Sequence, residues 1–442
     1  MPTRRSYPFA FLSRVSFTAR SSCTGCIGLA WLVLGVVGLS SAGDDWPQFR
    51  GPGGQGHADA RELPVEWSES KNVAWKTSVP GKGWSSPVIA GETIWLTTAL
   101  DAGQSLRAVA IDRRSGSIAH DIEVARPESP PKINDKNSYA SPTPVIDDGR
   151  VYVHFGTFGT ACLDATTGRQ LWRNEELKLN HSEGPGSSPV VHGDLLLVNC
   201  DGIDAQYVAA FDKHTGEVVW KTPRSGPFND DPQQRKAFST PLVIDVGGTS
   251  QLVSPGAERV AAYDPATGQE LWHVNYDGFS NVPRPLFAHG LLFVCTGYMR
   301  PQLWAIRPGG EGDLTESAVV WRCPKQAPAN PSPILVGEEL YMVSDAGVLT
   351  CLDAQSGSEH WQKRMGGNFS ASPLYADRRL YLSSEEGTTH VVEPGRKFKP
   401  LASNQLDGRM MASPAAVGRS LFLRTEEHLY RIETTPPTAA GG

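Results

Sequence analysis

The chain has 442 residues and a formal net charge of −6, and it contains no run of basic residues. A mildly acidic protein of this kind lacks the cationic face that nucleic-acid binding needs, so we expect no nucleic-acid partner. The 45 glycines and 34 prolines are typical of a chain built largely from turns, and no long segment has a helical period.

Residues 1–42 have the features of a secretory signal peptide. Four arginines and no acidic residue accompany an apolar stretch at 27–39, and Ser40, Ser41 and Ala42 offer a cleavage site. The apolar stretch is short for a transmembrane helix, and an uncleaved anchor is the alternative interpretation. We therefore predict a periplasmic or extracellular protein, with no stable membrane span once the signal is removed.

After an N-terminal extension at 43–71, one pattern recurs along residues 72–433. Each copy begins with Ser-Pro or a similar step, continues through short apolar strands, and typically reaches Asp-x-x-Thr-Gly and a tryptophan. The clearest copy runs from Ser188 to Trp220. A period of about 40–50 residues with four short strands is the signature of a β-propeller. Residues 434–442 follow the last copy, and we expect them to form a disordered tail.

The copies can be counted by the prolines with which they begin. Eight prolines begin a copy, namely Pro87, Pro142, Pro189, Pro241, Pro285, Pro333, Pro373 and Pro414. We therefore predict an all-β, eight-bladed propeller of four-stranded antiparallel blades. Seven blades is the alternative, because the copies that begin at Pro285 and Pro373 lack the full Asp-x-x-Thr-Gly turn.

The last copy lacks a fourth strand, whereas residues 72–77 read as a fourth strand that precedes the first copy. We expect this N-terminal strand to complete the last blade, because a closed ring leaves no open sheet edge. The tryptophans of the fourth strands should fill the space between adjacent blades. These residues are Trp172, Trp220, Trp272, Trp321 and Trp361.

Five cysteines lie beyond the predicted signal peptide, all at strand positions: Cys162, Cys200, Cys295, Cys323 and Cys351. Their odd number and placement indicate buried free thiols rather than a disulfide framework. Cys23 and Cys26 form the one Cys-x-x-Cys pair. Because cleavage would remove that pair, we assign it no metal or redox role.

Residues just before the innermost strands should line the propeller axis. By alignment of the repeats these are Trp84, Tyr139, Glu183, Lys236, Asn281, Arg284, Asn330, Asn368 and Arg409. Together they would suit a pocket for an anionic or polyol-like ligand. A hydrated channel whose polar groups bond to one another is the alternative. We expect Glu183, Asn281 and Asn368 to converge on one mouth of the axis.

The pattern assigns no catalytic residue and no metal ligand. Asn229, Asp230 and Asp231 could offer oxygen atoms to Ca²⁺, although their spacing equally fits an exposed acidic loop. His181 lies close to Glu183 in the chain, so the two could form an acid–base pair. A solvated loop histidine is the simpler interpretation.

The segment from Ala161 to Trp172, with Leu-Asp-Ala-Thr-Thr-Gly at its centre, resembles the pyrroloquinoline quinone (PQQ) repeat. This repeat defines the quinoprotein alcohol dehydrogenase-like superfamily, and the likeness covers roughly residues 72–433. The opening Asp-Trp-Pro-Gln-Phe-Arg-Gly-Pro at 45–52 also resembles secreted PQQ-like propellers of planctomycete-type bacteria. The resemblance implies an eight-bladed propeller. It implies either a PQQ-dependent dehydrogenase with Ca²⁺ on the axis or a non-catalytic propeller such as the assembly factor BamB.

The sequence departs from both kinds of relative. It has no adjacent cysteines to form the disulfide that stacks on PQQ, no Cys-x-x-Cys-His haem site, and no cysteine at the cleavage region for a lipid anchor. We therefore expect a monomeric, non-catalytic binding or scaffold module whose partner is a protein or a small polar ligand. A Ca²⁺-dependent PQQ oxidoreductase of alcohols or sugars, with its pocket on the axis, is the alternative.

Overall fold

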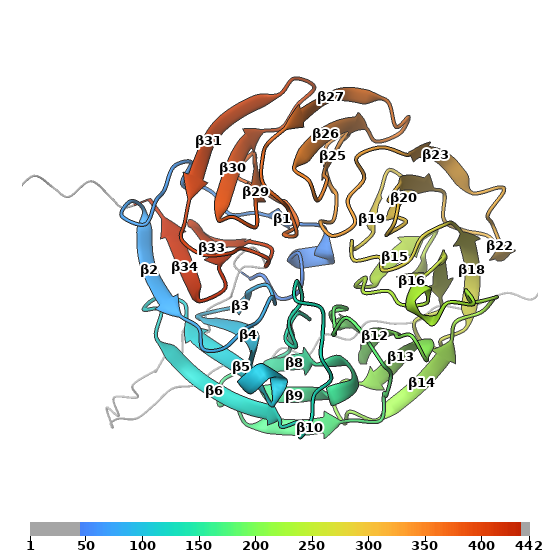
Figure 1. Ribbon diagram of the computed structural model, residues 1–442, viewed down its shortest axis with the longest axis horizontal. Helices are drawn as coiled ribbons and strands as arrows, with labels where there is room; N and C mark the ends of the chain where they lie inside the picture. The colour runs from blue at the N-terminus through green and yellow to red at the C-terminus, as the bar shows by residue number, and fades with distance from the viewer. Residues whose placement is uncertain (1–44, 435–442) are drawn as a thin grey trace, which may run out of the picture. The chain divides into compact units, whose positions relative to one another are not determined.

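The computed structural model describes residues 45–434, so the predicted signal peptide at 1–42 lies outside the described residues, as does the predicted tail apart from Thr434. Eight sheets surround a single axis, and each contains four antiparallel strands (Figure 1). The prediction of an all-β, eight-bladed propeller is confirmed, and the seven-bladed alternative is wrong. The copies at Pro285 and Pro373 form complete blades even though their third turns are irregular.

The first four blades follow one another along the chain, each with its first strand nearest the axis. Blade 1 is β3 (Val88–Ala90), β4 (Thr93–Leu100), β5 (Ser105–Asp112) and β6 (Ile118–Ala125). Blade 2 is β7 (Val145–Asp147), β8 (Arg150–His154), β9 (Thr160–Asp164) and β10 (Gln170–Asn174). Blade 3 is β11 (Val190–His192), β12 (Leu195–Asp201), β13 (Gln206–Asp212) and β14 (Val218–Pro223). Blade 4 is β15 (Leu242–Val246), β16 (Thr249–Gly256), β17 (Arg259–Tyr263) and β18 (Glu270–Asn275), with the short β22 (Gly312–Asp313) added in parallel.

The remaining blades keep the same order. Blade 5 is β19 (Leu286–Ala288), β20 (Leu291–Cys295), β21 (Leu303–Ile306) and β23 (Val319–Cys323). Blade 6 is β24 (Ile334–Val336), β25 (Glu339–Val343), β26 (Val348–Asp353) and β27 (Glu359–Arg364). Blade 7 is β28 (Leu374–Ala376), β29 (Arg379–Ser383), β30 (Thr388–Glu393) and β31 (Lys399–Gln405). Blade 8 is β32 (Ala415–Val417), β33 (Ser420–Arg424), β34 (His428–Glu433) and, outermost, β2 (Val73–Ser78). Single 3₁₀ turns are η1 (Pro52–Gly54), η2 (Asp101–Gly103), η3 (Gly156–Phe158) and η4 (Pro232–Gln234).

The second strands and most third strands of the blades are buried on both faces, because neighbouring blades pack against them, whereas β30 and β34 are buried mainly on one face. All seven residues of β13 except Asp212 are buried, whereas the outer strand β2 alternates half-buried and exposed side chains. The hydrophobic core therefore lies between adjacent blades. One cluster joins Tyr152 of blade 2 to Leu196 and Phe211 of blade 3. Strands that are covered on both sides read as continuous apolar runs, whereas strands with one solvated face alternate.

Tryptophans of the fourth strands pack on the turn between the third and fourth strands of the next blade. The Nε1–H of Trp172 donates to the carbonyl oxygen of Lys213 at 3.0 Å, and Trp220 makes the same bond to Pro265. The indole lies so close to the turn glycine that a Cβ at Gly216 would be 2.5 Å from the ring of Trp172. The Trp and the Gly of the repeat are therefore two halves of one contact between blades.

Trp272 is the exception to this contact. Its Nε1–H donates to Gln251 within its own blade at 2.8 Å, and its side chain is fully buried. The following blade 5 has no Asp-x-x-Thr-Gly turn on which the ring could pack. The irregular copy is thus accommodated by a change in the preceding tryptophan.

The strand β2 pairs in antiparallel fashion with β34, from Val73 opposite Ile432 to Ser78 opposite His428. Its Trp75 donates to the carbonyl oxygen of Arg113 in blade 1 at 3.0 Å, which repeats the contact of the other fourth-strand tryptophans.

The N-terminal extension runs outward along blade 7. Trp46 forms a bridge with Ile89, and β1 (His57–Ala58), which is labelled near the centre of Figure 1, pairs in parallel with β28. Further along, the backbone N–H of Trp67 donates to Asn404 at 2.9 Å. Ala60, Leu63 and Trp67 join the apolar cluster between blades 7 and 8. This segment is therefore an integral part of the propeller.

The cysteines after the signal region are free thiols. Cys162, Cys200, Cys295 and Cys351 are buried, as expected, but Cys323 is half-exposed because it ends the outermost strand of blade 5. Within residues 45–434, no helix is both long and apolar enough to cross a lipid bilayer.

Candidate functional site: a pocket on the propeller axis

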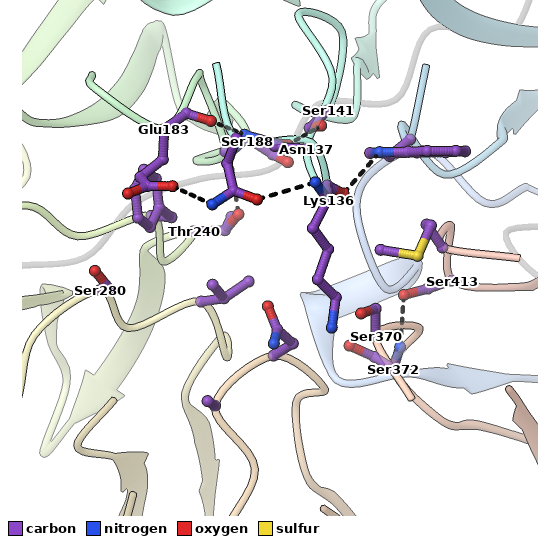
Figure 2. Close-up of a pocket in the computed structure, with 18 of the residues that line it drawn as sticks. Lys136, Asn137, Ser141, Glu183, Ser188, Thr240, Ser280, Ser370, Ser372 and Ser413 are labelled. Carbon is purple, nitrogen blue, oxygen red and sulfur yellow. Dashed lines mark hydrogen bonds between the residues drawn. The ribbon is translucent and has the colours of Figure 1, made fainter. Parts of the chain in front are cut away.

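A pocket of about 520 Å³ opens on the axis. The residues that line it come from the segments leading into the innermost strands, together with Phe49 of the N-terminal extension and Tyr298 from the turn between β20 and β21. Polar side chains are labelled around it in Figure 2, with Glu183 on one side and Ser370, Ser372 and Ser413 on the other. A concave site on the axis of a rigid frame is where a propeller offers a ligand the most contacts.

A ring of hydroxyl groups forms one wall of this pocket. In seven of the eight blades, the residue immediately before the first-strand proline is a serine or threonine whose hydroxyl oxygen accepts the backbone N–H of the corresponding residue in the preceding blade. These hydroxyl-ring residues are Ser86, Thr143, Ser188, Thr240, Ser332, Ser372 and Ser413, and the seven bonds measure 2.9–3.1 Å. The Ser-Pro step of the repeat is therefore an inter-blade hydrogen bond as well as a strand start.

In the second blade, the structure shifts the predicted start of the repeat by two residues. The proline directly before β7 is Pro144, not Pro142, and its preceding Thr143 is the member of the hydroxyl ring. Two Pro-containing steps follow one another here, so the motif alone does not decide between them. Pairing with Ser86 on one side and Ser188 on the other decides it.

Arg284 occupies the eighth position of the ring. It is 2% exposed, and its guanidinium donates to the carbonyl oxygens of Pro241 at 3.1 Å and Phe49 at 2.7 Å. A Cβ at Gly54 would lie 2.0 Å from its Nη1, so a side chain at this position would displace the guanidinium. Phe49, whose carbonyl oxygen accepts a hydrogen bond from Arg284, lines the pocket.

Two lysines and one carboxylate bring charge to the pocket. Lys236 is 5% exposed, and its ammonium group lies 3.1 Å from Glu183 and donates to Gln233 at 2.8 Å. Lys136 extends across the pocket toward Ser370 and Ser372 (Figure 2) and pairs with Glu385 of blade 7 at 2.8 Å. The Lys136–Glu385 pair therefore connects the loop between blades 1 and 2 with blade 7.

Four of the nine residues predicted at the axis line the pocket: Trp84, Glu183, Lys236 and Asn330. Trp84 is buried and donates its Nε1–H to the carbonyl oxygen of Lys136 at 3.1 Å. Asn330 donates its amide to the carboxylate of Asp345. Arg409 does not line the pocket but lies over the ring of Trp84 at 6.0 Å and pairs with Glu385 at 2.9 Å.

The other four predicted residues point elsewhere. Tyr139 donates to the carbonyl oxygen of Pro131 and packs among the residues between blades 1 and 2. Asn281 is fully buried and donates to the hydroxyl of Tyr276 at 2.6 Å, while Asn368 is bound to Glu386. Arg284 lies below the pocket in the hydroxyl ring. Of the three residues expected to converge on one mouth, only Glu183 lines the pocket.

The structure also shows the contacts of the other residues that the sequence suggested as an acid–base pair or as metal ligands. The Nε2 of His181 accepts the backbone N–H of Thr157 at 3.1 Å, and burial lowers its pKa to about 4. Glu183 instead contacts Lys236 and Asn134, so His181 and Glu183 make no acid–base pair. Asp231 caps η4 through the N–H of Gln233. Within residues 45–434 no three His, Cys, Asp or Glu side chains are grouped as a metal site.

Several lining residues escaped the sequence reasoning. They are the hydroxyl ring, Asn134, Lys136 and Asn137 of the long loop before blade 2, and the rings of Phe49, Phe238, Phe279 and Tyr298. The repeated Ser/Thr before each proline was a usable signal, because it recurs in register with the innermost strands. Phe49 carries no such signal, since the extension lies outside the repeat.

The lining residues do not fit a calcium–quinone site. Glu183 is the one acidic side chain that lines the pocket, and its two oxygens are already engaged by Lys236 at 3.1 Å and Asn134 at 2.6 Å. A Ca²⁺ ion needs six to eight oxygen ligands, several of them usually carboxylates. The chain also has no adjacent cysteines to form a stacking disulfide.

Fold and site together define an eight-bladed propeller of PQQ-like repeats with a pocket on its axis. The chain belongs to the family described as outer membrane protein assembly factor BamB, whose model matches residues 156–245 and 256–408.

Similar proteins include both outer membrane protein assembly factors and dehydrogenases. The BamB of Moranella endobia is 22% identical over 66% of this chain and 68% of its own length. A quinoprotein ethanol dehydrogenase of Pseudomonas aeruginosa is 30% identical over 29% of this chain and only 22% of its own length. Among solved structures, the quinohemoprotein alcohol dehydrogenase of Comamonas testosteroni superposes with a TM-score of 0.65 at 13% identity, over 91% of this chain and 82% of that protein. At this identity the structural likeness establishes the fold alone.

Proposed function

We propose that this protein is an extracytoplasmic binding module that holds a small polar ligand, or a polar segment of a partner protein, in the axial pocket. The observation that carries the proposal is the construction of the pocket. The hydroxyl ring draws one residue from each of seven blades, and Phe49 of the N-terminal extension lines the same pocket. A pocket built by the whole ring is preformed, so a ligand would lose little affinity to ordering of the protein.

The extracytoplasmic location rests on the signal-like composition of residues 1–42. The alternative of partner binding draws support from two exposed apolar side chains beside the pocket. Tyr298 and Met299 are 53% and 69% exposed, and Tyr298 also lines the pocket. The name of the relatives, outer membrane protein assembly factor, is compatible with a protein partner.

A variant that fills the pocket provides the test. Ala329 lines the pocket and is half-buried, so Ala329→Trp should occupy the space, whereas Ala329→Ser should leave it open. We expect polar compounds found by a thermal-shift screen of residues 43–442 to show saturable calorimetric binding that Ala329→Trp abolishes and Ala329→Ser retains. Equal binding to both variants would show that the ligand binds away from the axial pocket. If no compound binds, the proposal is contradicted.

The oxidoreductase alternative comes from the dehydrogenase relatives, and it predicts a different result. Calorimetric titration with PQQ, with and without Ca²⁺, should give no Ca²⁺-dependent binding if the carboxylate of Glu183 stays bound to Lys236. Saturable, Ca²⁺-dependent binding of PQQ would favour the oxidoreductase and would call for a screen of alcohols and sugars.

A further inference from the structure

The hydroxyl ring has hydrogen atoms left to donate. A serine or threonine hydroxyl carries one O–H donor and two acceptor lone pairs. Each hydroxyl of the ring uses a lone pair to accept a backbone N–H. Within residues 45–434 none of these seven hydroxyls donates to another protein atom, and six of them line the pocket. The ring therefore presents O–H donors toward whatever occupies the axis.

Positive charge is concentrated around the same ring. Arg284 is a member of it, Arg424 donates to the carbonyl oxygen and hydroxyl of Ser85 at 2.9 and 2.7 Å, and Arg50 donates to the carbonyl oxygen of Pro333 at 2.8 Å. Ser85 and Pro333 are the immediate chain neighbours of the ring residues Ser86 and Ser332.

These three arginines have no carboxylate partner among the described residues. Arg50, Arg284 and Arg424 are each 2% exposed, and two nitrogens of Arg50 and two of Arg424 are buried without a hydrogen-bond partner. Burial without a counter-charge lowers the pKa of each of them to about 9. A buried cation that lacks a partner is costly, so an anion placed nearby would be stabilised.

The lysines of the pocket and their carboxylate partners do not remove this excess of positive charge. Lys236 and Lys136 each face one carboxylate, Glu183 and Glu385, and Glu385 is shared with Arg409. The groups around the ring and pocket thus contain more cations than anions, although the whole protein has a net charge of −6. A local field opposite in sign to the net charge selects ligands of negative charge.

Apolar side chains also contribute to the lining. They are Phe49, Trp84, Phe238, Phe279 and Met411. Aromatic rings in such a site contact the carbon body of a ligand rather than its charge.

We propose that the axial pocket binds an organic acid, whose anionic oxygens accept hydrogen bonds from the hydroxyl ring and Lys236 while its carbon skeleton packs on the aromatic walls. This inference rests on the proposed function and specifies the ligand class. The anion is held by O–H and N–H donors and needs no metal ion.

Pairs of probes that share a carbon skeleton and differ in charge test the ligand class. Gluconate is compared with gluconamide, and benzoate with benzamide, by calorimetric titration of residues 43–442. We expect at least one acid to bind about tenfold or more tightly than its neutral partner. If the neutral partners bind as tightly, the inference fails while the proposed binding function stands. If neither acids nor any neutral polar compound binds, both fail.

Two variants, one that removes a positive charge and one that removes a negative charge, test where the anion binds. Lys236→Gln should weaken binding of the acid by about tenfold, whereas Glu183→Gln, which frees Lys236 of its counter-ion, should strengthen it. Lys397→Gln, an exposed lysine in the turn between β30 and β31, is the matched control and should change nothing. Acid binding that is insensitive to both Lys236→Gln and Glu183→Gln would overturn the assignment to this pocket.

Discussion

The hydroxyl of Ser86 accepts the backbone N–H of Ser413 at 3.1 Å, although 327 residues separate the two in the chain. This bond joins blade 8 to blade 1 and repeats the bond that links the neighbouring blades around most of the ring. The ring is interrupted only at Arg284, where the N-terminal segment passes beneath the axis. Blade closure and the floor of the pocket are therefore built around one layer of residues.

Removal of one hydroxyl from the ring should destabilise the fold. Ser188→Ala leaves the buried N–H of Thr143 without its acceptor, which lies 2.9 Å away, and should lower the free energy of unfolding by about 1–3 kcal/mol. Ser187 supplies the control, because its hydroxyl is buried without a hydrogen-bond partner. Urea unfolding should show Ser187→Ala to be neutral or stabilising. Equal losses in the two variants would contradict a structural role for the ring.

The passage of the N-terminal segment beneath the axis should depend on Gly54. Gly53 and Gly54 both have positive φ, 66° and 69°, so alanine strains the backbone at either position. Only at Gly54 would the new Cβ meet the guanidinium of Arg284, whereas Gly53 faces open space. Gly54→Ala should therefore be less stable than Gly53→Ala by about 1–3 kcal/mol. The same midpoint of chemical unfolding in both variants would show that this contact is dispensable.

Loss of the outermost strand of blade 8 should expose a sheet edge. Deletion of Asn72 to Thr77 removes most of β2 and leaves the outer edge of β34 unpaired, while its other edge stays paired with β33. We expect the variant to unfold or to multimerise, because an open edge pairs readily with another chain. Size-exclusion chromatography with light scattering and a thermal melt provide the measurement. A monomeric deletion variant with unchanged melting would contradict the role of β2 in closure.

Acid should destabilise the protein through a buried histidine. His154 on β8 contacts Thr160 at 2.8 Å and faces His181, and burial lowers its pKa to about 3. Between the ordinary pKa near 6.5 and this value, the unfolded chain binds a proton that the folded chain does not. The contribution of His154 to the free energy of unfolding is therefore fully present above about pH 6.5. It decreases as the pH falls, by about 3 kcal/mol at pH 4.

The variant His154→Gln isolates that contribution. Glutamine does not titrate, so the decline in unfolding free energy between pH 7 and pH 4 should become shallower, whatever the change at pH 7. His192→Gln, on the partly exposed end of β11, removes one histidine elsewhere and should keep the original decline. Parallel pH profiles for wild type and His154→Gln would refute the prediction.

Much of the candidate site could not be predicted because residues at similar places before the innermost strands make different contacts. Trp84 and Lys236 line the pocket. Asn281 occupies a similar place, but its amide turns inward to Tyr276. At Asn281 the choice between pocket and core depends on the hydroxyl of Tyr276, five residues earlier, which is not part of the repeat motif.

The sequence by itself determined the all-β class, the eight blades and the fourth-strand tryptophans. The all-β class and the tryptophans are encoded within one copy, by apolar strands and by a turn whose Asp and Gly form local contacts, and the blade count follows from the number of copies. Only the tertiary structure decided that the Ser/Thr-Pro steps form a ring, that Phe49 lines the pocket, and that Lys136 reaches Glu385. Those contacts join segments from different blades, and they exist only once the ring brings the segments together.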